Sequence, residues 1–469
     1  MIALSRNHFL VLGLTYALAI IYASLMLGPD GMHYVRLEPT EALRRFLAIR
    51  YVAHDADQRP DWIANLLLLV PLGYLTRAAL QGAGGRSNAT VDTGLALIVC
   101  VLFVLAVKFA QLYVPPRTVT LNYVTAQVIG ATLGIALVPV FRVAIRPRLV
   151  AMRDRGDGLQ ILLGIYTAWL ILYFLLPFDF TLSVTELRDR LAELPAMLLA
   201  VPGRGHAAAF RALLVVADIV STIPVGMFLA TSDRRQSLKV QLGRGVALMI
   251  TVEGLTWFVI SATPFAVALI FRTAGIALGL LFMEWIKGKD LRKRHYTFSR
   301  FMPAAILVYA LFATAAEGLF SGGWIPVREA LDTLDMRQLI PLWPDYIVSK
   351  AEASRSLVEH AVLFAPIGVM VWVRRGFWSS GARVSAVLAF GLSLAAEIGR
   401  GLKPGLRPDF TDPIIAAVAA GIAFKAMPLL WRLFEQEATM WSPVDQYVAS
   451  LPPGSAVKSG AAVPPAYRA

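Results

Sequence analysis

The residues best suited to chemistry stand close together near the end of the chain. They form one short series, Glu397-x-x-Arg400, then Pro404-Gly405, then Arg407-x-Asp409-x-x-Asp412. Glu397 and Arg400 are three residues apart and would share one face of a helix. Asp409 and Asp412 would fall in the first turn of the next helix, where carboxylates suit the helix dipole. Arg407 would lie between the acidic groups, and a guanidinium steered by carboxylates suits a phosphate or carboxylate ligand.

Three interpretations of this cluster stay open from the residues alone. The first is an ion-pair and capping network that fixes a tight helical hairpin. The second is a binding site for an anionic headgroup or a glycan-linked lipid. The third is general acid–base catalysis by Glu397, Asp409 and Asp412, although the sequence identifies no nucleophile or substrate position.

Composition determines what kind of element must carry these residues. The chain has 469 residues, of which 57% are apolar and only 16% are charged, so lipid has to be the solvent for much of its surface. Stretches such as 9–27 and 159–178 approach the ~20 apolar residues that cross a bilayer as a helix. The expected fold is all-α, a polytopic bundle of about twelve transmembrane helices. The single cysteine, Cys100, excludes an intrachain disulfide.

A pattern that occurs three times organises the chain into units of about 150 residues. In each unit a polar residue stands six positions before a Pro-x-Gly element; these pairs are Asn65 and Pro71, Asp218 and Pro224, and His360 and Pro366. We predict three units of four helices at 1–150, 151–295 and 296–437, followed by a disordered tail at 438–469. The long first loop of each unit is expected to carry short helices.

A second set of landmarks keeps the same register. Small-residue spans carry Gln127, Gly130 and Gly134 in unit one, Arg272, Gly275 and Gly279 in unit two, and alanines in unit three. The glycine pairs predict close helix packing. A charge within a span costs about 2.5 to 3.5 kcal/mol on insertion scales, so Lys108, Glu253 and Arg272 need partners. Glu253 and Arg272 lie at similar depth, and we predict that they pair.

Charge placement predicts the topology. The formal net charge is +13, and the Lys and Arg residues gather in alternate loops. By the positive-inside rule these loops and both termini are cytoplasmic, which places the Glu397–Asp412 series at the extracytoplasmic face.

Other chemistry is not expected. His360 is the one histidine in a predicted span and the other five are scattered, so we expect a hydrogen-bonded structural histidine and no metal site. The sequence has no phosphate-binding glycine loop and no Gly-x-Ser-x-Gly motif. No cofactor and no nucleic-acid partner are therefore expected.

These patterns together resemble the VanZ-like membrane proteins, a family associated with resistance to the glycopeptide teicoplanin. Unit one carries the family's outline as Asn65, Pro71, Gly73, Gln111, Arg117, Gln127, Gly130 and Gly134, with Lys108 where an acid is expected. Unit three carries it as Pro366, Gly368, Glu397, Pro404, Arg407, Asp409 and Asp412, with His360 for Asn and Arg400 for Gln. Unit two matches least.

The resemblance implies a multi-pass protein of the bacterial cell membrane that binds an amphiphilic or lipid-linked ligand at its outer face. Its candidate binding residues are Glu397, Arg400, Arg407, Asp409, Asp412, Asn65, Gln111, Arg117 and His360. Glycopeptide resistance and surface-polysaccharide handling both fit this role, and membrane lipids are the expected partners. A transporter or lipid flippase is the alternative, and a membrane enzyme is the third choice.

Overall fold

The computed structural model describes most of the chain. The described residues are 6–26, 34–52, 59–81, 88–114, 119–176, 178, 180–181, 183–199, 208–234, 236–260, 266–287, 291–320, 322–333, 342, 350–376, 379–404 and 408–440. Within this part the structure is all-α, and its one β-bridge joins Phe180 to Val259. The expected fold class is thereby confirmed.

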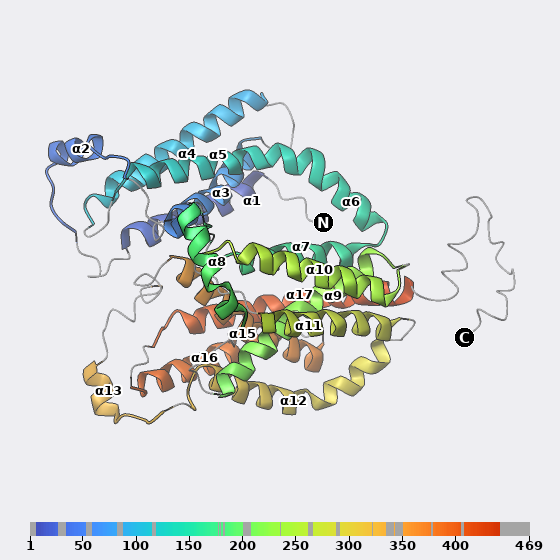
Figure 1. Ribbon diagram of the computed structural model, residues 1–469. Coiled ribbons are helices and arrows are strands. Elements are labelled where there is room, and N and C mark those ends of the chain that lie inside the picture. Colours follow the sequence, from blue (N-terminus) through green and yellow to red (C-terminus); the bar gives the residue numbers. More distant parts are fainter. Residues whose placement is uncertain are drawn as a thin grey trace, which may run out of the picture.

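Twelve long helices occupy the positions of the twelve expected spans (Figure 1). The first unit contains α1 (Arg6–Ile21), α3 (Arg59–Gln81), α4 (Ala89–Gln111) and α5 (Leu121–Val140). The second contains α7 (Gly158–Phe174), α9 (Ala208–Ser232), α10 (Leu238–Thr256) and α11 (Ala266–Ile286). The third contains α12 (Leu291–Ala316), α15 (Lys350–Arg375), α16 (Gly381–Gly401) and α17 (Asp412–Met440).

Ten helices in the described part are long and apolar enough to cross a membrane. The other two long helices are α7, which is apolar but has 17 residues, and α10, whose sequence includes Lys239 and Arg244. Large apolar side chains such as Leu18, Leu102 and Leu307 are more than half exposed, as a lipid-facing surface requires. A multi-pass helical membrane protein is confirmed, and the exact number of twelve spans stays a prediction.

Further helices, of 7 to 16 residues, lie in the connections between the twelve expected spans. These are α2 (Pro39–Leu47), α6 (Arg146–Asp154), α8 (Val184–Leu199) and α13 (Val327–Thr333), with π-helical turns η1 (Tyr22–Met26) and η3 (Phe141–Ile145). The long first loop of each unit carries one of them, namely α2, α8 or α13, as expected. The predicted tail is shorter than expected at its start, because α17 continues to Met440; residues 441–469 lie outside the described part.

The Pro-x-Gly helix of each unit packs at backbone distance against the small-residue helix. A Cβ atom on Gly73 would overlap the carbonyl oxygen of Ala131, and one on Gly226 would overlap that of Ile276. Gly368 and Ala420 repeat this contact between α15 and α17. Only a glycine admits such an approach. Close packing of the unit-one glycine pair is also confirmed, since Cβ atoms on Gly130 and Gly134 would overlap the carbonyls of Leu66 and Val70.

A tyrosine on the first helix of each unit donates a hydrogen bond to a backbone carbonyl of the Pro-x-Gly helix. The pairs are Tyr16 to Leu68 at 2.9 Å, Tyr166 to Ser221 at 2.9 Å and Tyr309 to Leu363 at 2.6 Å. Each carbonyl lies three residues before the proline, next to the carbonyl at i−4 that the proline leaves without its helical N–H donor. These parallel contacts support the three-unit hypothesis, which stays a prediction.

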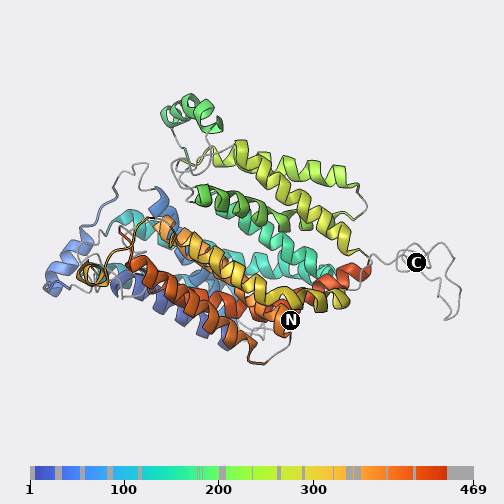
Figure 2. The same ribbon diagram turned by 90° about the horizontal axis from the view of Figure 1, so that it is seen from below.

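The units contact one another at both ends of the bundle. At one end Arg59 of α3 forms an ion pair with Glu186 of α8 at 2.8 Å, and the Tyr173 hydroxyl lies 3.1 Å from Oε1 of Glu359 on α15. The helices α2 and α13 also lie at this end, whereas α17 ends at the other (Figures 1 and 2).

Candidate functional site

Glu397 is the centre of a buried ionic cluster in the third unit. Its side chain, on the last turns of α16, is completely buried. Nη1 of Arg400 donates to its Oε1 at 2.9 Å, and the backbone N–H of Asp409 donates to its Oε2 at 2.6 Å. Both carboxylate oxygens are therefore bonded, as a buried charge requires.

Arg400 is surrounded by carboxylates. Besides Glu397, its Nη1 lies 3.3 Å from Oε2 of Glu317 and 3.7 Å from Oδ2 of Asp412. One quarter of its side chain is exposed, whereas Glu317, Asp412 and Glu397 are almost wholly buried. The expectation that a guanidinium here is available to an anion is therefore weakened, because internal carboxylates already neutralise Arg400.

Asp409 has a different place from the one expected. Helix α17 begins at Asp412, so Asp409 precedes the helix rather than lying in its first turn. The start at Asp412 agrees with Pro413, since proline suits the first turn of a helix. Oδ1 of Asp409 accepts a hydrogen bond from the Thr411 N–H at 2.7 Å, which makes it a turn-stabilising group next to the helix N-terminus.

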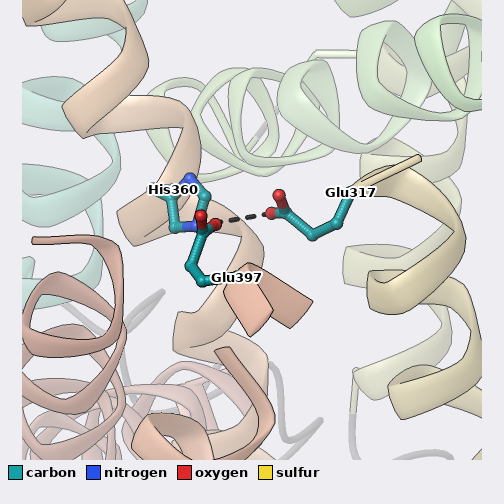
Figure 3. A group of neighbouring side chains, drawn as sticks. All are labelled: Glu317, His360 and Glu397. Carbon is teal, nitrogen blue, oxygen red and sulfur yellow. Dashed lines mark ion pairs between the residues drawn. The ribbon is translucent and has the colours of Figure 1, made fainter. Parts of the chain in front are cut away.

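His360 faces the same cluster from α15. Its Nε2 lies 3.3 Å from Oε1 of Glu317 and 3.4 Å from Oδ2 of Asp412 (Figure 3). The residue is 8% exposed, and its ring stacks on Phe364 with the centroids 5.4 Å apart. Nε2 makes no hydrogen bond of acceptable geometry within the described structure. The expectation of a hydrogen-bonded histidine is thus not met at this atom.

Glu317 is the member that the sequence reasoning missed. It lies one residue beyond α12 and beyond the apolar span that ends at Ala316. Burial raises its pKa to about 7; the neighbouring Arg400 opposes this rise and Glu397 adds to it. A signal for this position exists in the register of the units: Glu317 follows Tyr309 by the same interval at which Ser24 follows Tyr16.

The equivalent positions of unit one carry different chemistry. Asn65 accepts a hydrogen bond from Gln127 at 2.9 Å, and Lys108 donates to Gln111 at 3.1 Å. Gln111 in turn donates to the backbone oxygen of Ser24 at 3.4 Å. These hydrogen bonds stay within the first unit, and none of them joins Asn65 or Gln111 to the third-unit cluster. The remaining candidates, Arg117 and Arg407, lie outside the described residues.

Unit two confirms the predicted intramembrane pair. Nη1 of Arg272 donates to Oε1 of Glu253 at 2.9 Å, and its Nε donates to Oδ1 of Asp218 at 3.1 Å. The guanidinium also lies 4.1 Å from the centroid of the Phe174 ring. Two acids of this unit thus share one cation supplied by the small-residue helix.

The fold and the site define the class of this protein. It is a polytopic helical membrane protein with a predominantly acidic, buried cluster near one end of its third unit. Residues 9–142 match the model of the VanZ/LLP1 family. The chain is therefore a multi-pass membrane protein with multiple apolar helices, and its first 142 residues include a region similar to the VanZ/LLP1 family. The match covers the first predicted unit, and the resemblance of the other two stays a prediction. No curated protein and no solved structure matches the chain.

Proposed function

We propose that this VanZ-like protein acts in the bacterial cell envelope by binding an amphiphilic, glycan-bearing lipid at the extracytoplasmic end of its third unit. The observation that carries the proposal is the joint presence of a buried acidic cluster and an exposed aromatic rim. Charged groups in membrane helices are costly and usually mark a functional site. The ligand's polar head would meet the cluster while its chains stay in lipid.

The cluster is suited to a head group that donates hydrogen bonds. Three carboxylates, from Glu317, Glu397 and Asp412, lie within 4 Å of the guanidinium of Arg400, and the backbone amide of Asp409 is bonded to Glu397. Sugar hydroxyl and amino groups donate to carboxylates, whereas a bare phosphate would meet mostly negative charge. Arg400, with one quarter of its side chain exposed, is the most accessible of these side chains, and such a ligand would enter beside it.

The aromatic rim lies beside the exposed edge of this cluster. The Ile325 N–H donates to the Leu402 carbonyl at 3.0 Å, which fixes the segment before α13 to the end of α16. Phe320 and Trp324 in this segment are 70% and 59% exposed, and Lys403 lies 4.3 Å from the centroid of the Trp324 ring. Exposed aromatic side chains at a helix end are typical of the membrane–water interface.

Glycopeptide protection or surface-polysaccharide handling would both follow from binding such a ligand, by analogy with the family. The test is mass spectrometry of native lipids that co-purify with the wild-type protein, Arg400→Gln and Trp324→Ala. Arg400→Gln introduces the residue type found at Gln111 in unit one. We expect a glycolipid enriched over bulk lipid in the wild type and depleted in both variants.

Arg244→Gln is the matched control, because Arg244 is more than half exposed and pairs only loosely with Asp233 at 3.4 Å. It should retain the wild-type lipid profile. A profile of bulk lipid in all four proteins would contradict the proposal and favour an ion-pair network that only fixes the α16–α17 hairpin.

A further inference from the structure

The charges of the third-unit cluster do not balance. Glu397 and Asp412 lie within 4 Å of Arg400, as does Glu317, and the amide of Asp409 is bonded to Glu397. One guanidinium thus faces three carboxylates in a largely buried site. Taking such charges out of water is expensive unless protons or cations compensate them.

In each of the other two units, a basic side chain lies beside the polar residues that correspond to this cluster. Unit one has Lys108 at the position of Glu397, and unit two has Arg272 between Asp218 and Glu253. The packing contacts set the register, since Arg272 lies four residues before Ile276 and Ala416 lies four before Ala420. Unit three therefore has a fully buried alanine where unit two has its guanidinium.

The donor atoms converge at metal-ligand spacing. One atom from each of Glu317, His360 and Glu397 lies within 4.8 Å of the others. Zn–N and Zn–O bonds of about 2.0 to 2.2 Å put neighbouring ligands of a tetrahedral ion about 3.4 Å apart. The two contacts of His360 Nε2, at 3.3 Å to Glu317 and 3.4 Å to Asp412, match this separation.

His360 supports a metal site independently of the carboxylates. Its Nε2 is buried, points at Glu317 and Glu397 in Figure 3, and makes no hydrogen bond within the described structure. An imidazole nitrogen that accepts no hydrogen bond has a lone pair that can coordinate a divalent metal ion. Arg400 contacts the Oε2 atom of Glu317, whereas the Oε1 atom of the same carboxylate faces Nε2 of His360.

We propose that Glu317, His360 and Glu397, with Asp412 as a fourth donor, bind one divalent transition-metal ion of the Zn²⁺ class. An imidazole with carboxylates suits such ions better than Mg²⁺ or Ca²⁺, which prefer oxygen ligands alone. The ion joins the turn after α12 to α15, α16 and α17 and compensates the two excess negative charges. This inference goes beyond the proposed function and does not rest on it.

The test uses the purified full-length protein in detergent, stripped with EDTA and then titrated with Zn²⁺ or Co²⁺. We expect one ion per chain by elemental analysis and a Co²⁺ visible spectrum of a low-coordinate site. His360→Asn introduces the residue type that unit one has at Asn65, and Glu317→Gln removes one carboxylate charge. Each should lower the affinity by roughly 100-fold or more.

His8→Asn is the matched control, since His8 is exposed on α1, and it should bind as the wild type does. Wild-type protein that takes up no stoichiometric ion overturns the proposal, whatever the variants do. Equal affinity in His360→Asn, Glu317→Gln and the control also overturns it. Stoichiometric metal with an unselective lipid profile would leave this inference standing and contradict the proposed ligand.

Discussion

The backbone N–H of Asp409 donates to Oε2 of Glu397 at 2.6 Å, across the connection between α16 and α17. Because Glu397 is completely buried and also bonded to Arg400, this one carboxylate joins a helix end, a guanidinium and the start of the next helix. A buried carboxylate with both oxygens bonded is costly to replace by any group that cannot accept those bonds.

Glu397→Ala should therefore destabilise the protein by about 1 to 3 kcal/mol, because it leaves the buried Asp409 amide without its acceptor, whereas Arg400 keeps Glu317 and Asp412 as partners. Glu397→Gln keeps one acceptor oxygen and should cost less. The measurement is unfolding in an SDS titration followed by tryptophan fluorescence. Glu284→Gln, at a half-exposed side chain, is the control; equal losses in Glu397→Ala and the control would refute the buried role.

The stability of the metal-free protein should fall as the pH rises toward neutrality. The pKa of Glu317 is raised from 4.5 to about 7, chiefly by burial. Between these two values the unfolded chain has lost the proton that the folded protein keeps, so stability decreases with pH and levels off above 7, by roughly 3 kcal/mol at most. Glu397, Arg400 and His360 face this carboxyl.

Thermal unfolding in EDTA at pH 5 to 8 measures this dependence. In Glu317→Gln the downward slope between pH 5 and 7 should flatten. A slope in the variant as steep as in the wild type would assign the dependence to another group.

Gly368→Ala should destabilise the helix pair α15–α17. The added Cβ would overlap the carbonyl of Ala420, so the helices must separate, at a cost of about 1 to 3 kcal/mol for overpacking. Gly391→Ala is the matched control because a Cβ there meets nothing within 4 Å. It should be neutral or slightly stabilising, since alanine has the higher helix propensity. Melting temperatures of the two variants in one detergent give the comparison; equal values would contradict the packing argument.

Arg234→Ala should weaken the contact between units two and three. Arg234 donates to both oxygens of Glu437, at 2.9 and 2.8 Å, and lies 3.2 Å from Asp157. Glu437 is 1% exposed, so losing its partner leaves a buried charge and should cost roughly 3 kcal/mol or more. Arg153→Ala breaks an exposed pair with Asp154 and should cost less than about 1 kcal/mol. Limited proteolysis of both variants would show a more accessible α17 only in the first.

Much of the fold follows from local patterns. Apolar length and the positions of prolines and glycines predicted the helices and the close packing of Gly130 and Gly134, because these features act within one or two helix turns. The pairing of Arg272 with Glu253 followed from their equal depth in adjacent helices. That argument needs only the rise per residue of a helix.

The composition of the acidic cluster could not be predicted in the same way. Glu317 meets Arg400 across 83 residues of chain, and no spacing rule connects them. The pattern around Glu397 suggested a site ready for an anion. Glu317 reaches the cluster from the turn after α12, and together with Glu397 and Asp412 it neutralises Arg400.

The last helix contributes a residue to an ion cluster at each of its ends. With 29 residues, α17 is ~44 Å long, which exceeds the ~30 Å of hydrocarbon that a span must cross. Asp412 at its first residue lies in the acidic cluster, and Glu437 near its last residue is bonded to Arg234. A tilt of α17 as a whole would therefore displace both ion clusters together, whereas a bend at Pro428 would move one without the other.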